Sequence, residues 1–210
     1  MIVDERIITF INSLDTKNSE ILEDIEREAL ADNVPIIRRE MQSFLKVLLM
    51  VKKPMRVLEV GTAVGFSALL MSEYVPEECA ITTIENYEKR IPIARQNFVR
   101  AGKEKKITLL EGDAMDVLKT LEGPYDFIFM DAAKGQYIHY LPEILRLLAK
   151  GGILVSDNVM QDGDVIESRF AVERRDRTIH ARMREYLYEL KHNDCLLYTS
   201  PSPRDTERSR

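Results

Sequence analysis

Five short apolar runs that alternate with helical segments restrict the fold of this chain more than any other feature. The runs end in glycine, aspartate, glutamate or asparagine, and they occupy residues 56–61, 80–85, 106–112, 125–131 and 152–158. This alternation predicts an α/β fold, in which helices flank a mostly parallel sheet. Because such sheets bind ligands at the carboxyl ends of their strands, the polar residues that end the runs are candidate site residues.

The segments around these runs complete the predicted organisation. Residues 1–53 show helical periodicity and predict three amphipathic helices that cap the same domain, whose core spans residues 54–194. A long helix is expected over residues 173–193. Pro92 is expected to kink the helix over residues 87–101 or to shift its start.

Length and composition narrow the class of protein. The 210 residues suffice for one domain, so any two ligands must share it. A net charge of -5 argues against a surface that coats nucleic acid, although a local basic patch is compatible with it. Cys79 and Cys195 are too few for a disulfide framework and have no zinc spacing. The longest apolar stretch is far shorter than the roughly 20 residues that cross a bilayer. With no signal peptide expected either, we predict a cytoplasmic protein without membrane contact.

The turn after the first predicted strand is the first candidate binding site. It places Gly61 and Gly65 before a helix start, where glycine lets the backbone approach a ligand and the helix offers free N–H groups. The dinucleotide fingerprint G-x-G-x-x-G is not met, because Ala63 and Phe66 stand at its second and third glycine positions. A plain strand-to-helix turn is the other alternative. It is disfavoured because Glu85 ends the second run, where a ribose-binding carboxylate is expected, and Asp113 ends the third run in register with it. Either acid alone would be only an acid at a strand end.

The E-x-G-x-x-x-G pattern that starts at Glu59 resembles the first motif of class I S-adenosylmethionine (SAM) dependent methyltransferases, which have a Rossmann-like fold. The resemblance implies that the turn faces the methionine part of SAM, that Glu85 binds the ribose hydroxyls, and that the end of the third strand holds the adenine. The implied SAM contacts are Ile37, Glu59, Gly61, Gly65, Ser67, Glu85, Asp113, Ala114 and Asp131.

Three oxygen-bearing residues end the fourth and fifth predicted strands. Asp131 closes the fourth run, and Asp157 with Asn158 closes the fifth, so their side chains are expected at one edge of the sheet. Two carboxylates and an amide, without histidine or cysteine, suit a hard cation such as Mg²⁺. An isolated strand-end aspartate more often caps a helix, which is the alternative for either aspartate alone.

Two segments around these residues resemble the metal-dependent O-methyltransferases, the group that includes catechol and caffeoyl-coenzyme A methyltransferases. They are M-D-A-A-K-G-Q-Y at residues 130–137 and S-D-N-V at residues 156–159. Within that group, V-P-I-I before the third helix, A-K-G-Q-Y and a later arginine-rich segment look most like the bacterial tRNA 5-hydroxyuridine methyltransferases. The resemblance implies 5-methoxyuridine at the tRNA wobble position as product, a homodimer, and the metal ligands Asp131, Asp157 and Asn158.

Lys134 follows Asp131 by three residues and is the candidate general base beside it. Methyl transfer from a sulfonium is an in-line displacement, so the acceptor oxygen must be aligned and made anionic. An acceptor with two adjacent oxygens can chelate the metal, which lowers the pKa of its hydroxyl, and Lys134 can take the proton. A surface lysine at a helix start is the alternative.

The arginine-rich segment after the fifth predicted strand bears on which kind of acceptor the protein binds. A cluster of this kind suits phosphate contacts, and the flanking Phe170 could stack on a base. A solvated helix face and a lid over a small acceptor are the alternatives. The arginines are Arg169, Arg174, Arg175, Arg177, Arg182 and Arg184. Three functions therefore stay open: methylation of tRNA, methylation of a small catechol-like or phenolic acceptor, and SAM or RNA binding without turnover.

The end of the chain departs from the family pattern. Relatives follow the long helix with two further strands and an I-I-P-V-G-D-G-like turn, and this segment is missing here. Residues 195–210 contain two prolines and several serines and threonines, which predicts an unrelated, disordered tail. We therefore expect an open sheet edge and an uncovered apolar face.

Overall fold

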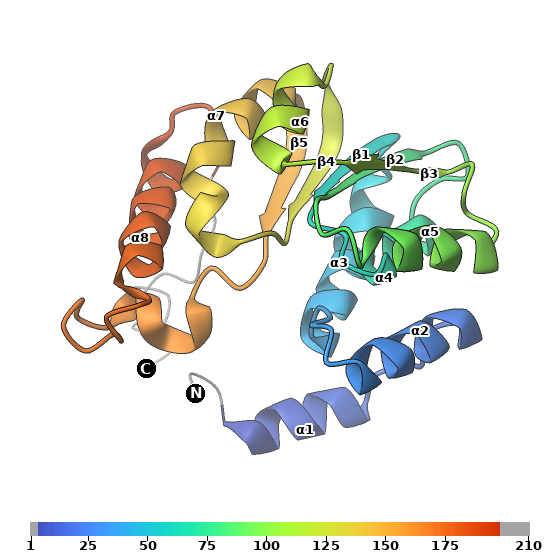
Figure 1. Cartoon of the computed structure of the whole chain (residues 1–210), viewed down its shortest axis with the longest axis horizontal. Coiled ribbons are helices and arrows are strands. Elements are labelled where there is room, and N and C mark those ends of the chain that lie inside the picture. The colour runs from blue at the N-terminus through green and yellow to red at the C-terminus, as the bar shows by residue number, and fades with distance from the viewer. Residues whose placement is uncertain (1–3, 198–210) are drawn as a thin grey trace.

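Five parallel strands form one sheet in the computed structural model of the chain, which describes residues 4–197 (Figure 1). The strands are β1 (Arg56–Val60), β2 (Ala80–Glu85), β3 (Ile107–Glu111), β4 (Tyr125–Met130) and β5 (Leu148–Ser156). Their spatial order is β3-β2-β1-β4-β5 and all neighbours pair in parallel, which confirms the predicted α/β fold. The order reverses between β1 and β4, where open parallel sheets bind ligands.

Helices cover both faces of this sheet (Figure 1). On one face, α4 (Phe66–Glu73) and α5 (Ile91–Arg100) share a core with two of the N-terminal helices. The other face carries α6 (Ala114–Thr120), α7 (Tyr137–Leu147) and α8 (Arg177–His192). Two short 3-10 helices, η1 (Lys134–Gln136) and η2 (Gln161–Ile166), come before α7 and α8. The sheet is therefore the middle one of three layers.

The strands read as continuous apolar runs because helices bury both of their faces. Along β4, Phe127 and Phe129 belong to the core under α4 and α5, while Ile128 and Met130 belong to the core under α7 and α8. Successive residues of a strand point to opposite faces, so burial on both sides removes the usual alternation of apolar and polar residues.

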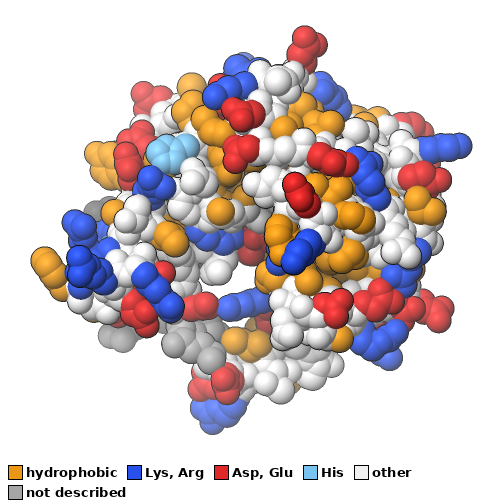
Figure 2. All heavy atoms as spheres, viewed as in Figure 1, with side chains coloured by type: hydrophobic (Ala, Val, Ile, Leu, Met, Phe, Trp, Pro, Cys, Tyr) orange, Lys and Arg blue, Asp and Glu red, His pale blue; other side chains and the backbone are white. Residues whose placement is uncertain are grey.

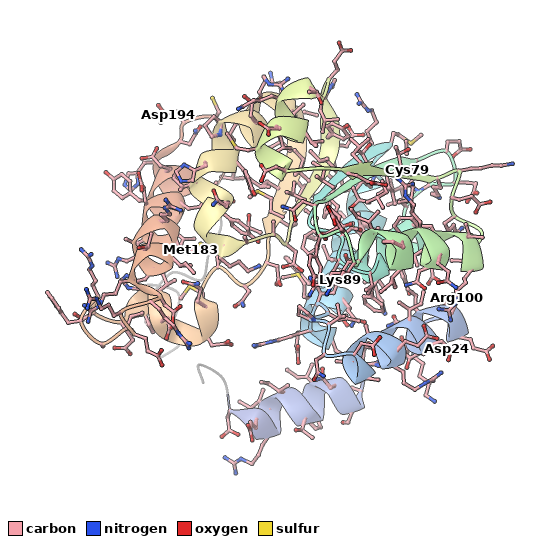
Figure 3. The ribbon with its side chains drawn as sticks, in the orientation of Figure 1. Asp24, Cys79, Lys89, Arg100, Met183 and Asp194 are labelled. Carbon is pink, nitrogen blue, oxygen red and sulfur yellow. The ribbon has the colours of Figure 1, made fainter. Side chains whose placement is uncertain are left out.

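The three N-terminal helices form as predicted, but they do not pack equally. They are α1 (Glu5–Ser13), α2 (Glu20–Ala31) and α3 (Arg39–Lys52). Leu22 of α2 and Leu45 of α3 are fully buried in the first core. Arg100, labelled at the end of α5 in Figure 3, donates to Glu28 of α2 at 2.7 Å. By contrast α1 has no buried residue, and its apolar stripe stays about half exposed or more: Ile7, Phe10, Ile11 and Leu14.

Two helix starts differ from simple expectation for local reasons. Pro92 lies in the first turn of α5, which begins at Ile91, so the proline shifts the start of the helix and does not kink it. The long helix α8 begins at Arg177 and not at the predicted residue 173, since the residues before it form a turn.

The last strand, β5, is one of the two edges of the sheet in the described part of the chain. β5 begins at Leu148, before the predicted start at residue 152, and only Val155 among its residues is buried. This agrees with a sheet that lacks later strands within residues 4–197. Residues 198–210 of the predicted tail lie outside the described residues. Across the described residues, none of the helices has the length and apolar character that crossing a membrane requires.

Candidate cofactor and metal site

A cavity of about 1800 Å³ opens at the carboxyl edge of the sheet. Residues that follow each of β1 to β5 line it, and α1 and the start of α3 line it from the N-terminal side. Figure 2 shows the molecule hollowed near its centre, with Lys, Arg, Asp and Glu side chains around the opening. The cavity therefore lies where the strand order predicts a ligand site.

Backbone hydrogen bonds extend the sheet one residue beyond its strands and so align the strand ends. The N–H of Asp131 donates to the carbonyl of Val60 at 3.0 Å, and that of Asp157 donates to Met130 at 2.9 Å. Because β1, β4 and β5 are neighbours, the residue after each strand lies beside the residue after the next. Gly61, Asp131 and Asp157 therefore form a row in the cavity wall.

The loop after β1 requires glycine at two positions. Gly61 and Gly65 have φ values of +97° and +86°, which side chains rarely tolerate. A Cβ on Gly61 would collide with the backbone carbonyl of Asp131, and one on Gly65 would lie 2.5 Å from the ring of Phe98. The loop therefore packs directly against the backbone that carries Asp131.

Glu59 is buried beneath this loop and does not itself line the cavity. Its carboxylate accepts hydrogen bonds from the hydroxyls of Ser67, Thr62 and Thr83, the last two at 2.8 and 2.5 Å. Burial raises the pKa of Glu59 to about 7, although the three hydroxyl donors act against that rise. Since Thr62 and Ser67 do line the cavity, the structure gives Glu59 a supporting position behind the wall.

Glu85, at the end of β2, lines the cavity as its strand-end position predicts. Its carboxylate accepts the backbone N–H groups of Ala63, Asn86 and Tyr87 at 2.8, 3.0 and 2.8 Å. One of these donors belongs to the loop after β1 and two belong to the loop after β2. Glu85 therefore ties the two loops together.

The other predicted SAM contacts divide into two groups. Ile37 and Ala114 line the cavity, as do Gly61 and Ser67. Asp113 and Gly65 are not among the lining residues. The side chain of Asp113 caps α6 by accepting the N–H of Met115 at 2.8 Å. At this strand end the cavity wall is formed by its neighbours in the chain.

The predicted metal ligands Asp131, Asp157 and Asn158 line the same cavity. Burial raises the pKa of Asp157, and the negative charge of Asp131 raises it further. Two carboxylates that repel each other at a partly buried place, with an amide beside them, fit a hard divalent cation. The described residues contain no group of three or more His, Cys, Asp or Glu side chains placed to hold a metal, so this set depends on the amide of Asn158.

Comparison with known proteins identifies the family. The sequence model of the O-methyltransferase family matches residues 12–194, which include all the site residues named above. The chain belongs to the O-methyltransferase family. It is 35% identical to a catechol O-methyltransferase of Niastella koreensis, with 59% of this chain and 58% of that protein covered. It is also 35% identical to caffeoyl-CoA O-methyltransferase 2 of Populus trichocarpa, with 59% and 52% covered. The chain spans about half the length of the curated relatives it matches.

Solved structures extend the likeness to the whole fold. The O-methyltransferase of Bacillus cereus in complex with S-adenosylhomocysteine (SAH) has a TM-score of 0.79 and 25% identity, and 90% of this chain and 86% of that chain are covered. An SAH-bound methyltransferase of Podospora anserina has a TM-score of 0.82 and 27% identity, with the same shares covered. Class I O-methyltransferases therefore share the Rossmann-like architecture of this chain.

In this member of the family Lys134 is fixed beside Asp131. Its Nζ donates to Asp131 Oδ1 at 2.9 Å and to the Tyr137 hydroxyl at 3.0 Å. Tyr137 is fully buried and donates to the Met130 carbonyl at 2.8 Å. Tyr186 of α8 packs edge-on against Tyr137, with ring centroids 5.4 Å apart. Tyr137 thus helps to hold the lysine at the cavity wall, and Tyr186 packs against the ring of Tyr137.

The six arginines predicted to contact RNA fall into two groups, and none of them lines the cavity. Three donate to backbone carbonyls of η1, η2 and the segment before α8 at 3.0 to 3.3 Å, and they are Arg177, Arg182 and Arg184. The other three lie exposed in the loop before α8, and they are Arg169, Arg174 and Arg175. Phe170 in this loop is 85% exposed. The basic surface is therefore smaller than the sequence indicates.

The sequence motifs do not predict several of the residues that line the cavity. They are Arg38, Thr62, Tyr87, Arg90 and Tyr140. Thr62 lies inside the E-x-G-x-x-x-G pattern, so its position was available from the motif. The others lie outside the motif spacing, and only the fold brings them to the cavity.

Proposed function

We propose that the protein transfers the methyl group of SAM to a hydroxyl oxygen. The proposed acceptor is 5-hydroxyuridine at the tRNA wobble position, and the product is 5-methoxyuridine. The observation that carries the proposal is one cavity that contains both the glycine loop after β1 and the Lys134–Asp131 pair. Donor and acceptor must meet in one space for an in-line displacement. Membership of the O-methyltransferase family supports the reaction type.

The side of the cavity formed by β1 to β3 is proposed to bind SAM. The glycine loop would face the methionine part, Glu85 the ribose hydroxyls, and Gly112 with Ala114 the adenine. Each of these residues lines the cavity, with Gly61 representing the loop. The SAH-bound solved relatives support a cofactor of this kind.

The side formed by β4 and β5 is proposed to bind Mg²⁺ through Asp131, Asp157 and Asn158. When bound, a divalent cation would lower the pKa of the acceptor hydroxyl and fix its direction. The repulsion between the two aspartates supports a cation at this place. The positive charges of Lys134 and Arg38 favour the ionised form of Asp157.

Lys134 is proposed to take the proton of the acceptor hydroxyl. As the new O–C bond forms and the S–C bond breaks, the hydroxyl loses its proton, and Nζ of Lys134 accepts it in its amine form. The two N–H groups of that amine would point to Asp131 and Tyr137, which both lie within hydrogen-bond distance. The lone pair would then take the remaining tetrahedral direction, so the two acceptors together set its orientation.

The exposed loop before α8 supports an RNA acceptor. Arg169, Arg174 and Arg175 can contact phosphates, and the exposed ring of Phe170 can stack on a base. A small catechol-like or phenolic acceptor is the second candidate. It is favoured by the curated relatives, which are named catechol and caffeoyl-CoA O-methyltransferases. A homodimer stays a prediction of the family resemblance, and a cytoplasmic location stays a prediction from the sequence.

Incubation with methyl-labelled SAM and Mg²⁺ separates the candidate functions. One arm contains tRNA from cells that lack the modification, and the other contains catechol. We expect label in tRNA, and loss of that label in excess EDTA. Labelled catechol with unlabelled tRNA would support the small-molecule function. SAM binding without transfer to either would support a non-catalytic binding protein, and full activity in EDTA would contradict the metal assignment.

A further inference from the structure

An ion pair crosses the cavity between two segments that lie far apart in the sequence. Arg38, the residue before α3, donates through Nη2 to Asp162 Oδ1 of η2 at 2.8 Å. Both residues line the cavity, and their side chains are 68% and 61% exposed. The pair therefore joins the N-terminal helices to the loop that follows Asp157 and Asn158.

Arg38 differs from the other cations that line the cavity in the kind of partner that holds it, which is an exposed carboxylate of a distant segment. Lys134 is bound to Asp131 and Tyr137. Arg39 is bound to Glu23 and Glu26 inside the N-terminal helices, at 3.4 and 2.7 Å. Arg90 lies over the ring of Tyr87.

The partner of Arg38 is itself an exposed side chain of a loop. Exposed ion pairs of this kind contribute at most about 1 kcal/mol. A stronger anion can therefore displace Asp162.

Arg38 also lies near the acceptor end of the cavity. Its partner Asp162 lies in the segment that follows Asp157, and Arg38, Asp157 and Asp162 all line the cavity. The hydrogen bond and charge of Asp162, and after them the charges of Glu40 and Asp157, raise the pKa of the Arg38 guanidinium. Asp157 belongs to the strand-end row with Asp131, where the reacting oxygen is proposed to lie. A group bound to Arg38 would therefore be part of the acceptor, close to the oxygen that is methylated.

We propose that Arg38 binds a phosphate of the acceptor nucleotide and that Asp162 holds the guanidinium until the acceptor arrives. The planar guanidinium offers two parallel N–H groups to phosphate oxygens, and such contacts are stronger than those of a neutral donor. Catechol has no phosphate, so Arg38 would discriminate between the two candidate acceptor classes. This inference rests on the proposed function, because it presupposes a nucleotide acceptor.

The backbone around Asp162 keeps its side chain available for this exchange. Gln161, Asp162 and Gly163 have positive φ values of +47°, +53° and +110°. Three successive residues with a positive φ form a compact turn, and this turn places the Asp162 carboxylate next to Arg38. Asparagine tolerates this backbone region well, so Asp162→Asn removes the charge and keeps the turn.

The test compares 5-hydroxyuridine with its 3′,5′-bisphosphate, which has both phosphates that flank a uridine in RNA. We expect the wild-type protein to prefer the bisphosphate by about tenfold or more in kcat/KM, and Arg38→Gln to lose most of this preference. Arg38→Lys is expected to keep part of it, and Asp162→Asn is expected to increase it several-fold. Calorimetry of bisphosphate binding without SAM gives a second readout. We expect Arg38→Gln to raise the Kd for the bisphosphate about tenfold.

Arg95→Gln is the matched control. Arg95 is also an exposed arginine paired with an acid, at 2.6 Å from Glu111, but it does not line the cavity. It is expected to keep the wild-type preference. The inference is overturned if the wild type shows no preference, or if Arg38→Gln lowers activity on both uridine compounds equally. If catechol is methylated and neither uridine compound is, the tRNA function is wrong and the inference falls with it.

Discussion

The two sides of the cavity are built in different ways. On the side of β1 to β3, buried carboxylates bind groups of neighbouring strands and loops: Glu59 accepts from Thr83 of β2, and Glu85 accepts from the N–H of Ala63. On the side of β4 and β5, Lys134 pairs with Asp131 three residues before it, and the exposed pair of Arg38 and Asp162 joins distant segments. The cofactor side is therefore held by buried carboxylates, and the acceptor side by ion pairs that are at least partly exposed. Substitutions on the two sides should have different consequences.

Lys134→Ala tests the acceptor side most severely. If Lys134 is the base, we expect kcat to fall by about 100-fold to 10,000-fold, while the Kd for SAM changes little. Steady-state methylation kinetics and calorimetry measure the two quantities. Lys89, an exposed lysine labelled in Figure 3 that is not among the cavity-lining residues, gives the matched control Lys89→Ala. An unchanged kcat in Lys134→Ala would remove the lysine from the mechanism.

The pH dependence of the free energy of unfolding tests the buried position of Glu59 on the cofactor side. Below about pH 4.5 its carboxyl is protonated in both the folded and the unfolded chain, whereas between pH 4.5 and 7 only the unfolded chain loses the proton. The free energy of unfolding should therefore fall by a few kcal/mol as the pH rises through this window, and level off above it. Denaturant titrations at several pH values measure this slope. Glu59→Gln should flatten it, and an equal slope in the variant would contradict the assignment.

The sequence predicts site residues best at the ends of the strands. Gly61, Glu85 and Asp131 were identified because each ends a strand, and the ends of neighbouring parallel strands meet at one edge. The motif could not distinguish residues in the cavity wall from residues behind it, so Glu59 was expected to contact SAM. The apolar stripe of α1 predicted a helix correctly, but not that its residues stay unburied.

Other features depended on contacts between distant segments. Tyr186 reaches Tyr137 only because α8 packs on α7, and no local pattern signals this contact. The sequence indicates that Arg182 is a candidate phosphate contact, but it does not show that this side chain binds the carbonyl of Gly135. In each case the missing information was the packing of one element on another.

Tyr137→Phe sharpens the comparison by removing one hydroxyl from the acceptor side. The ring stays, so packing against Tyr186 is kept, but Lys134 loses a hydrogen-bond acceptor. We expect kcat to fall by roughly tenfold, with little change in the KM for the acceptor. Tyr188→Phe on the exposed side of α8 is the control. A rise in KM with no loss of kcat would show that the hydroxyl does not position the lysine.

The smallest expected effect concerns the exposed loop before α8. Replacing Arg169, Arg174 and Arg175 by glutamine should raise the KM for tRNA several-fold and weaken its dependence on salt by roughly one contact for each arginine. Activity on catechol, if any, should not change. Methylation assays over a range of salt concentrations measure this effect. An unaltered salt dependence would place the RNA surface elsewhere.

The contact between Gly61 and the carbonyl of Asp131 has a consequence for how the ligands are loaded. At Gly61 no side chain separates the cofactor loop from the backbone of the acceptor side, so we expect a shift of one to displace the other. Binding free energies at the two places should then be coupled, and such coupling is reciprocal. The factor by which SAM tightens the binding of the acceptor must equal the factor by which the acceptor tightens the binding of SAM.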